Sequence, residues 1–488
     1  MADVLKGLEP SNVYDYFEKI CSIPHGSGNT KKISDYIASE GKRLGLDTYQ
    51  DEAGNVIIRK DATPGYEDAD IVVMQGHMDM VCEKTEDCDV DFKTDGLQLE
   101  VKDGVVSAKG TTLGGDDGIA VAYMLAILSS DEYKHPALEC VFTVDEEIGM
   151  LGAVALDMSQ IKGKMLINVD SEEEGILLAS CAGGIITELK VPYTREVPGK
   201  KKEAYSISIS GLTGGHSGSE IHKGYINADK LMGDILYELI QEDKSLRLVD
   251  INGGLMDNAI PVACNATVVS GDISTSLDIL KEIVFEFTNE YKEIEPNMLI
   301  MYDMAVSEGS EGDMEVFDKK STLNVINALK EVPNGVIKYS ESMEGMVQTS
   351  LNLGKLVTDE ADVRMVFLIR SSVNDEKQEL VDELKQLADK YEGSLETSSP
   401  YPAWEYKEES KLRPVMTSIF EEMFGHPMIV QSIHAGLECG IFCGGIEGLD
   451  AVSLGPNLFD IHTPRERMYI DSVQRTWDYL LRVLESLK

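Results

Sequence analysis

The chain has 488 residues, of which 43% are hydrophobic and 27% are charged. This length exceeds what one hydrophobic core usually supports, so we expect two or more globular domains. The 86 acidic and 44 basic side chains leave a formal net charge of −42, which disfavours binding to nucleic acid or to an anionic membrane.

The N-terminal residues lack the basic and apolar regions of a secretory signal, and no run of about 18 apolar residues predicts a transmembrane helix. The eight cysteines include no CxxC pair. This usage is typical of a reducing compartment, where thiols serve as small buried hydrophobic groups. We therefore expect a soluble cytoplasmic protein.

The first part of the chain alternates between two apolar patterns. Helical spacing recurs over 13–20, 30–44 and 119–128, and short apolar runs typical of strands lie between these stretches. Such alternation predicts βαβ units and therefore an α/β fold. The segment VPYTREVPGKKKEAYS then mixes Pro, Gly and Lys between two strand patterns, which indicates the start of an inserted domain.

The predicted insertion has its own strands and helices. Strand patterns occur at AYSISISG and ADVRMVFLIRSS, and amphipathic helical patterns cover 228–240, 277–291 and 376–391. Pro400 and Pro402 mark a return, after which HAGLECGIF, DAVSLGP and a final helix restore the first pattern. We therefore predict one domain from residues 1–186 and 399–488, interrupted by an inserted α+β domain of residues 187–398.

Five motifs carry acidic or imidazole side chains suited to metal binding, and four of them directly follow an apolar run. They are GHMDM with His77, GGDDG with Asp116, DEEIG with Glu147, NVDSEEEG with Asp170 and DIHTP with His462. Sites of open α/β sheets form at the carboxyl ends of strands. A metal pair needs nitrogen and oxygen ligands from several segments and one bridging carboxylate. The set therefore predicts a two-metal site.

Spacing within two of the motifs suggests separate roles for neighbouring residues. Alternate residues of a strand share a face, so Asp79 lies beside His77 and can fix the tautomer of its ring. Adjacent residues cannot share a face, so one of Glu146 and Glu147 can bind metal while the other faces a water molecule.

Each motif alone has a simpler interpretation. His-x-Asp is often an ordinary hydrogen-bonded pair, acidic runs are usually solvated loops, and Gly-Gly-Asp-Asp-Gly can be only a turn. The joint occurrence of all five motifs, in this order, favours the metal site.

The motif order also resembles a known family. GHMDMV, GGDDGIAVA, TVDEEIGMLGA, INVDSEEEG, GGHSG and DIHTPRE are similar to the motifs of the two-zinc metallopeptidases that include carboxypeptidase G, succinyl-diaminopimelate desuccinylase, aminoacylase and bacterial dipeptidases. Within that group the chain most resembles the aminoacyl-histidine dipeptidases, also called Xaa-His or cytosol non-specific dipeptidases. The resemblance covers nearly the whole chain. It implies a mixed-sheet, dizinc aminopeptidase-like catalytic domain with an inserted α+β lid domain.

The resemblance assigns roles to the metal-site residues. Two Zn²⁺ ions per chain are expected, with Co²⁺ or Mn²⁺ as alternatives, and a hydroxide bridging them would be the nucleophile. The implied bridging ligand is Asp116, the other ligands are His77 and Asp170 for one ion and Glu147 and His462 for the other, the general base is Glu146, and the residue that orients the first imidazole is Asp79.

The resemblance also implies substrate-binding residues. His216 of GGHSG would stabilise the oxyanion, with His222 a weaker candidate. The substrate would be held by Asn258 and Arg370, and the pocket lined by His434, Gly436 and Glu438, the last facing a free substrate amine. The simpler interpretation is that the lid histidines lie on the surface and that Arg370 makes an ordinary surface ion pair.

These observations predict a dizinc dipeptidase with Xaa-His or broad dipeptide specificity. One alternative is an N-acyl amino acid amidohydrolase of the aminoacylase type, which shares the metal motifs but needs no free substrate amine. The other is a metal- or peptide-binding protein without activity, which would lack a ligand or the base. Small dipeptides are the expected partners, nucleic acid and membranes are not, and a homodimer stays open.

Overall fold

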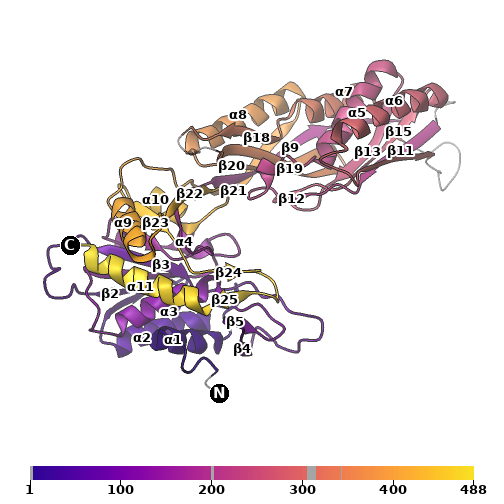
Figure 1. Ribbon diagram of the computed structural model, residues 1–488. Helices are drawn as coiled ribbons and strands as arrows, with labels where there is room; N and C mark the ends of the chain where they lie inside the picture. The colour runs from indigo at the N-terminus through magenta and orange to yellow at the C-terminus, as the bar shows by residue number, and fades with distance from the viewer. Residues whose placement is uncertain (1–3, 199–202, 305–314, 342, 344) are drawn as a thin grey trace. The chain divides into compact units, whose positions relative to one another are not determined.

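The computed structural model describes residues 4–198, 203–304, 315–341, 343 and 345–488 (Figure 1). The chain divides into two compact units. Unit 1 comprises Met1–Cys181, Trp404–Ile433 and Leu437–Lys488, and unit 2 comprises Ala182–Ala403 and His434–Gly436. The first boundary thus follows Cys181, whereas the sequence predicted it after residue 186. The short segment His434–Gly436 groups with unit 2 although both of its flanking segments belong to unit 1.

Unit 1 contains most of the predicted βαβ pattern. Its elements are α1 (Ser11–Cys21), α2 (Lys31–Arg43), β1 (Asp47–Gln50), β2 (Val56–Lys60), β3 (Val72–His77), β4 (Leu99–Lys102), β5 (Val105–Ala108), α3 (Gly115–Leu128), β6 (Leu138–Thr143), α4 (Leu151–Ala155), a 3₁₀ turn (Met158–Gln160), β7 (Met165–Asn168), β8 (Ile176–Cys181), α9 (Leu412–Phe424), β22 (Ile429–Ile433), α10 (Glu438–Gly445), β23 (Asp450–Ser453), β24 (Leu458–Phe459), β25 (Arg467–Tyr469) and α11 (Ile470–Ser486).

A mixed eight-stranded sheet forms the centre of unit 1, in the order β1-β2-β6-β3-β7-β23-β8-β22. Strand β3 is parallel to both β6 and β7, whereas β2 is antiparallel to β6. The sheet confirms the predicted mixed α/β fold. Because β3, β6 and β7 are parallel neighbours, their carboxyl ends meet at one edge of the sheet.

Helices α1, α2, α3, α9 and α11 contribute buried side chains to one continuous core with the sheet. All 14 residues of α3 are buried, because this apolar helix packs between α1 and β3. The first turn of α3 is irregular, with non-helical backbone at Asp116 and Asp117. Regular helix therefore starts close to the predicted residue 119. A second sheet of unit 1, in the order β24-β25-β5-β4, contributes buried side chains to the same core.

Unit 2 is the inserted α+β part. Its elements are β9 (Gly183–Pro192), β10 (Arg195–Glu196), β11 (Glu203–Ser210), β12 (Gly215–His216), a 3₁₀ turn (Ile221–Lys223), α5 (Ala228–Glu242), β13 (Arg247–Gly253), β14 (Ala259–Ile260), β15 (Cys264–Ser270), α6 (Ile273–Tyr291), β16 (Leu299–Met304), β17 (Val316–Phe317), α7 (Lys319–Glu331), β18 (Gly335–Tyr339), β19 (Val347–Thr358), β20 (Asp362–Ser371), α8 (Asn374–Lys390) and β21 (Ser394–Tyr401).

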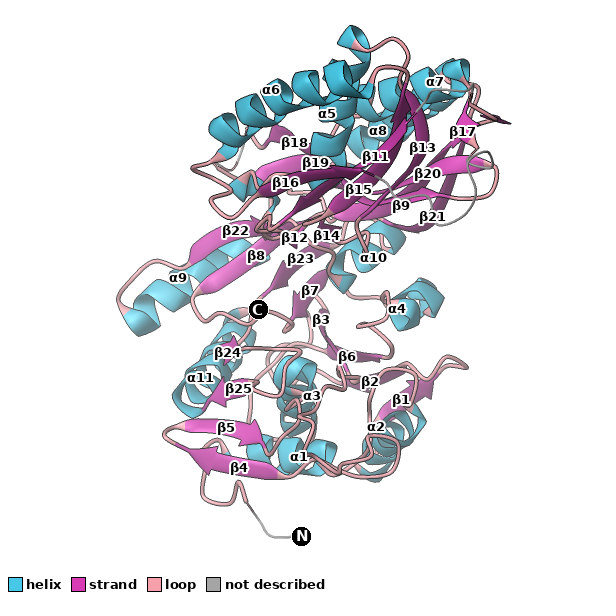
Figure 2. Cartoon of the chain, turned by 90° about the vertical axis from the view of Figure 1, so that its right-hand side faces the viewer, coloured by secondary structure: helices cyan, strands magenta, loops and turns pink. Residues whose placement is uncertain are grey.

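The main sheet of unit 2 runs β16-β11-β15-β13-β19-β20-β9-β21, with β18 paired to β19. Helices α5 to α8 lie on one face of it in both views (Figures 1 and 2), and their buried apolar side chains form one core with the strands. The alternating burial along β11 and β9 is the pattern of strands that cover a core with one face.

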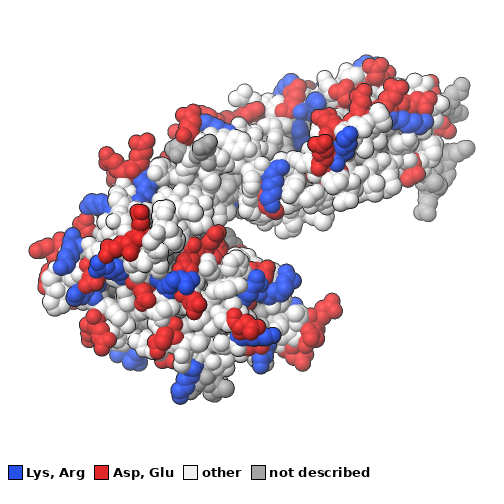
Figure 3. Space-filling view, viewed as in Figure 1, with Lys and Arg blue, Asp and Glu red and all other residues white. Residues whose placement is uncertain are grey.

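Charged side chains of both signs lie on the surface of the molecule (Figure 3). On the face shown in Figure 3, basic side chains are interspersed among acidic ones and form no extended basic surface. Among the described helices, none has both the length and the apolar character that a membrane crossing requires.

One buried acid in unit 2 predicts how stability depends on pH. Asp229, in the first turn of α5, is fully buried, and Gly253 leaves the space that its carboxyl group occupies beside Cys264. Burial raises the pKa of Asp229 from 3.8 to about 8. Between these values the folded chain holds one proton that the unfolded chain has released. The free energy of unfolding should therefore fall with rising pH, by about 1.4 kcal/mol per pH unit.

Asp229→Asn should remove this dependence and stabilise the protein at neutral pH relative to the wild type. Urea unfolding of both proteins between about pH 5 and pH 8 measures the difference. Asp278→Asn, at an exposed position of α6 whose side chain pairs with Lys281, is the control and should keep the wild-type dependence. An unchanged slope in the Asp229 variant would contradict the prediction.

Candidate metal centre

Three of the predicted ligand segments lie at one edge of the unit 1 sheet. His77 is the last residue of β3, Glu146 and Glu147 follow the end of β6, and Asp170 follows β7. These strands are parallel neighbours, so the segments after them are brought together by the sheet itself. The parallel pairing of β3, β6 and β7 is thus the structural reason why these residues, predicted at strand ends, lie near one another.

The other two candidate ligands come from outside the sheet. Asp116 lies in the irregular first turn of α3, after Gly114 with φ of 67°. His462 lies in the loop between β24 and β25, also with a positive φ of 58°. Both loops belong to unit 1, so all five predicted ligands are in the same compact unit.

The ligand atoms of these residues converge in three groups whose members lie within 4.8 Å of one another. The groups are His77, Asp116 and Asp170; Asp116, Glu147 and His462; and His77, Glu146 and Glu147. Each of the three offers three ligand atoms close enough together for one metal ion. The first two groups share Asp116, and they reproduce the division of ligands that the resemblance implied.

Asp116 has the geometry of a bridging carboxylate. Its Oδ1 lies 3.0 Å from Nε2 of His77, and its Oδ2 lies 3.1 Å from Nε2 of His462. Each histidine also has a second acidic neighbour. Nε2 of His77 is 3.5 Å from Oδ1 of Asp170, and Nε2 of His462 is 2.9 Å from Oε1 of Glu147. One carboxylate therefore faces two separate His and acid pairs.

Asp79 contacts both His77 and the Glu146–Glu147 turn. Its carboxylate lies 3.5 Å from Nδ1 of His77, whose ring also contacts the carbonyl oxygen of Asp79 at 3.0 Å. The same carboxylate accepts the backbone N–H of Glu146 at 3.0 Å and that of Glu147 at 3.4 Å. A proton on Nδ1 leaves Nε2 free to face Asp116, as a metal ligand requires. Asp79 thus holds both the imidazole and the Glu146–Glu147 turn.

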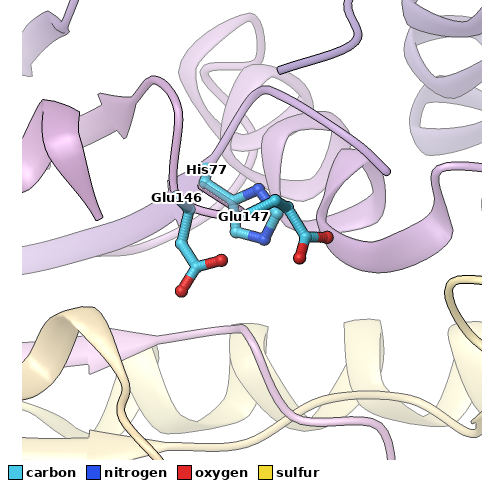
Figure 4. A group of neighbouring side chains, drawn as sticks. All are labelled: His77, Glu146 and Glu147. Atoms are coloured by element: carbon cyan, nitrogen blue, oxygen red, sulfur yellow. The ribbon is translucent and has the colours of Figure 1, made fainter. Parts of the chain in front are cut away.

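Glu146 and Glu147 point in different directions. In Figure 4 their carboxylates lie on either side of the His77 ring. Glu147 pairs with His462, which leaves the Glu146 carboxylate outside the Asp116-sharing groups. Burial, with Asp170, Glu438 and Glu147 adding to it, raises the pKa of Glu146 well above its usual value. A group with this tendency to hold a proton is suited to proton transfer.

The charges of the clustered side chains favour the binding of cations. Although burial opposes the shift, neighbouring acids, Asp170 first, raise the pKa of His77 well above its usual value. His462 and His77 lower the pKa of Asp116 despite its burial. Burial, with Asp116 and Glu147, raises the pKa of Asp170 to about 6. Carboxylates outnumber imidazoles here, so divalent ions would stabilise the crowded negative charge. The donor set of imidazole and carboxylate suits zinc.

Several residues that support the cluster were missed by the sequence analysis. Ser27 donates to Oδ2 of Asp79 at 2.8 Å, and the backbone N–H of Gly28 donates to Asp145 at 2.7 Å. Burial raises the pKa of Glu172 to about 8, and the negative charges of Asp116 and Asp170 add to this effect. Glu172 therefore lies near the proposed ligands. Glu172 belongs to a run of three acids, which is typical of a solvated loop, so no sequence pattern indicated the burial of this side chain.

Glu438, the predicted partner of a substrate amine, is fully buried in unit 1. Its Oε2 accepts from Gln75 at 2.5 Å and from Thr143 at 2.6 Å. Burial raises the pKa of Glu438 to about 7. Its Oε1 has no hydrogen-bond partner among the described residues. Contact with a substrate amine stays a prediction, and the structure adds that Glu438 supports the ends of β3 and β6.

In unit 2, His216 has a defined tautomer. It lies on β12, which pairs with β14, and its Nδ1 accepts N–H groups from Gly218 at 3.2 Å and Ser219 at 3.1 Å. Burial and the charge of Arg370 lower the pKa of His216. The neutral ring therefore carries its proton on Nε2 and can donate a hydrogen bond. The side chain of His222 is exposed in the 3₁₀ turn, and the side chain of Asn258 is exposed beside the His216 strand pair.

Arg370, on β20, is only 6% exposed. Its Nη1 donates to the hydroxyl of Tyr401 at 3.0 Å, and no carboxylate among the described residues forms an ion pair with it. His434, which with Gly436 belongs to unit 2, contacts Ser350 through Nε2 at 2.7 Å. Because Arg370 is buried, the simpler interpretation of a surface ion pair does not hold for it. Tyr401 was not predicted.

Comparison with known proteins identifies the family. The model of peptidase family M20/M25/M40 matches residues 73–486. The chain belongs to this family. It is 37% identical to the cytosol non-specific dipeptidase of Escherichia coli (strain K12), over 99% of both chains.

Two solved structures have a similar fold. Aminoacylhistidine dipeptidase from Vibrio alginolyticus is 37% identical, with a TM-score of 0.92 over 99% of this chain and 98% of that one. The aminopeptidase PepT from Bacillus cereus is 15% identical, with a TM-score of 0.56 over 98% and 99%, and is similar in fold alone. The resemblance inferred from the motifs is confirmed, and the chain is an enzyme of the peptidase class.

Proposed function

We propose that the chain is a dizinc dipeptidase that hydrolyses Xaa-His or a broad range of dipeptides. The observation that carries the proposal is the Asp116 carboxylate, which faces His77 with one oxygen and His462 with the other. Both full-length relatives at 37% identity are named dipeptidases. We also propose, from the name of the Escherichia coli relative, that the protein works in the cytosol.

The proposed metal ligands are His77, Asp116, Glu147, Asp170 and His462. When bound, two divalent ions would supply Lewis-acid activation of the substrate carbonyl and of the attacking water. Glu146 would accept a proton from that water and deliver it to the leaving amine. Asp79 would hold His77 and the Glu146–Glu147 turn in position relative to each other through the contacts it makes to both.

Unit 2 is proposed to act as the lid domain predicted for residues 187–398. The Nε2–H of His216 would donate to the oxyanion, with Asn258 beside it and His222 as the weaker candidate. Arg370, supported by Tyr401, would pair with the terminal carboxylate of the substrate, because guanidinium matches a planar two-oxygen partner. His434, Gly436 and Glu438 would line the pocket.

The proposal is tested by a substrate series. Gly-His and carnosine should be cleaved, whereas N-acetyl-His should be a poor substrate, because a dipeptidase recognises a free amine. Hydrolysis is followed by release of histidine. Preferred cleavage of N-acetyl-His would instead support the N-acyl amino acid amidohydrolase.

Arg370 predicts why cleavage should stop at dipeptides. A carboxylate one residue past the scissile bond can pair with the buried guanidinium, whereas an amide leaves it unpaired at a cost of several kcal/mol. The wild type should therefore prefer Gly-His to its C-terminal amide by about a hundredfold in kcat/KM or more. Arg370→Ala should lose most of this preference. Arg364→Ala, on the same strand but paired with Asp359, should keep it. Equal cleavage of acid and amide by the wild type would remove Arg370 from this role.

A further inference from the structure

A buried carboxylate joins two loops of the proposed metal centre. Glu466 is 3% exposed, and it accepts three backbone N–H groups, from Leu113 at 2.8 Å, Gly114 at 3.2 Å and Gly115 at 2.8 Å. The donors form the turn immediately before Asp116. The acceptor follows His462 by four residues, although about 350 residues of chain separate the two segments.

The glycines of this turn make the contact geometrically feasible. Gly114 has a φ of 67°, a left-handed conformation that glycine adopts without steric cost. A Cβ atom on Gly115 would lie 2.6 Å from the Leu458 side chain and 3.3 Å from Oε1 of Glu466. The absence of side chains at Gly114 and Gly115 therefore lets their N–H groups converge with that of Leu113 on one carboxylate, in the manner of an anion-binding nest.

The His462 loop is joined to the backbone of Glu466 by its own hydrogen bonds. The backbone N–H of Glu466 donates to the carbonyl of Thr463 at 3.0 Å, and the hydroxyl of Thr463 donates to the carbonyl of Asp460 at 2.7 Å. An ion pair between Asp460 and Arg467 closes the base of the loop. His462 thus lies on a short closed loop whose last turn ends at Glu466.

We propose that Glu466 is a positioning residue that sets the spacing between Asp116 and His462, and thereby the affinity of the ion held by Asp116, Glu147 and His462. The inference rests on the proposed two-metal function. On its other side, Asp116 is held by His77, whose strand does not depend on Glu466. Loss of the carboxylate should therefore act mainly on the His462 side.

Glutamine at position 466 keeps the side-chain volume but cannot replace the carboxylate. Its NH₂ group is a donor and would face N–H donors, and the remaining oxygen forms weaker hydrogen bonds than an ionised acceptor. Groups that orient metal ligands typically change metal affinity by about 10–100-fold when altered. We expect a loss of this size for one ion.

Glu139 provides a matched control within unit 1. It is also buried, and it accepts backbone N–H groups from Lys162 at 2.8 Å and Gly163 at 2.9 Å. It lies near the start of β6, about 13 Å along the strand from the end that carries the proposed site. Glu139→Gln therefore removes a comparable buried clamp without touching the ligands.

The test measures stepwise Zn²⁺ binding to the full-length protein by competition with a chromophoric chelator, and the visible spectrum of the Co²⁺-loaded protein. Glu466→Gln should bind the first ion like the wild type and the second about 10–100-fold more weakly, with an altered Co²⁺ spectrum. Glu139→Gln should match the wild type. Gly115→Ala, which pushes the turn away from Glu466, should reproduce the selective loss if the first variant folds poorly.

Other outcomes separate the possible failures. Wild-type affinities for both ions in Glu466→Gln would overturn the inference, as would equal losses at both. A lower apo melting temperature in both glutamine variants, with metal binding unchanged, would show a structural role only. Fewer than two ions in the wild type would overturn the proposed function first, and the inference with it.

Discussion

Glu146→Gln should lower kcat by about 10²–10⁴-fold while both metal ions stay bound and KM changes little. The amide cannot accept a proton from water or return it to the leaving amine. The backbone of this turn is held by Asp79 through main-chain N–H groups, so the substitution should leave the geometry of the loop intact. Steady-state kinetics with Gly-His, together with elemental analysis, measure the two effects separately.

Glu147→Gln is the matched comparison, since it makes the same change one residue along the chain. The Glu147 carboxylate pairs with His462, so this variant should weaken metal binding, and added metal should partly restore its activity. If Glu146→Gln loses metal and Glu147→Gln keeps it, the roles of base and ligand are reversed.

Asp116→Ala should lose both metal ions, and its activity should fall at least as far as that of Glu146→Gln. The reason is the shared geometry: Oδ1 faces His77 and Oδ2 faces His462, so truncation removes a ligand from both groups at once. The fully active wild type should hold two divalent ions per chain, and a strong chelator should abolish its activity. Elemental analysis after desalting measures the stoichiometry.

His462→Ala is the control for Asp116→Ala, because His462 belongs to only one of the two groups that share Asp116. It should retain one ion on the side of His77 and Asp170. If His462→Ala releases both ions, or if Asp116→Ala keeps one at wild-type affinity, Asp116 does not bridge.

Local backbone rules account for what could be predicted from the sequence. The apolar runs that end at His77, Thr143 and Asn168 became the parallel strands β3, β6 and β7, because a buried strand is recognisable from its own residues. Once those strands are parallel neighbours, their ends and the residues after them must lie together. The predicted α/β fold follows from such patterns, the mixed sheet was implied by the family resemblance, and both are confirmed.

The boundary between the two units was harder to predict from the sequence, because it depends on how distant segments pack. The chain near Cys181 continues from β8 into β9 with an apolar pattern on both sides, so no change in composition marks the passage between units. His434–Gly436 groups with unit 2 through contacts such as that of His434 with Ser350. No local rule predicts such a contact between distant residues.

The amino-acid sequence by itself determined which residue types stand at the strand ends, since a strand or a glycine turn depends on a few neighbouring residues. The tertiary structure alone decided which groups support them: Ser27 on Asp79, Glu438 beneath β3 and β6, Tyr401 beside Arg370, and Glu466 on the Gly114 turn. Each is a polar contact between distant segments, and no local pattern in the sequence pairs the two partners. Burial makes these contacts matter, because a buried polar group must find a partner, and burial is a property of the folded chain.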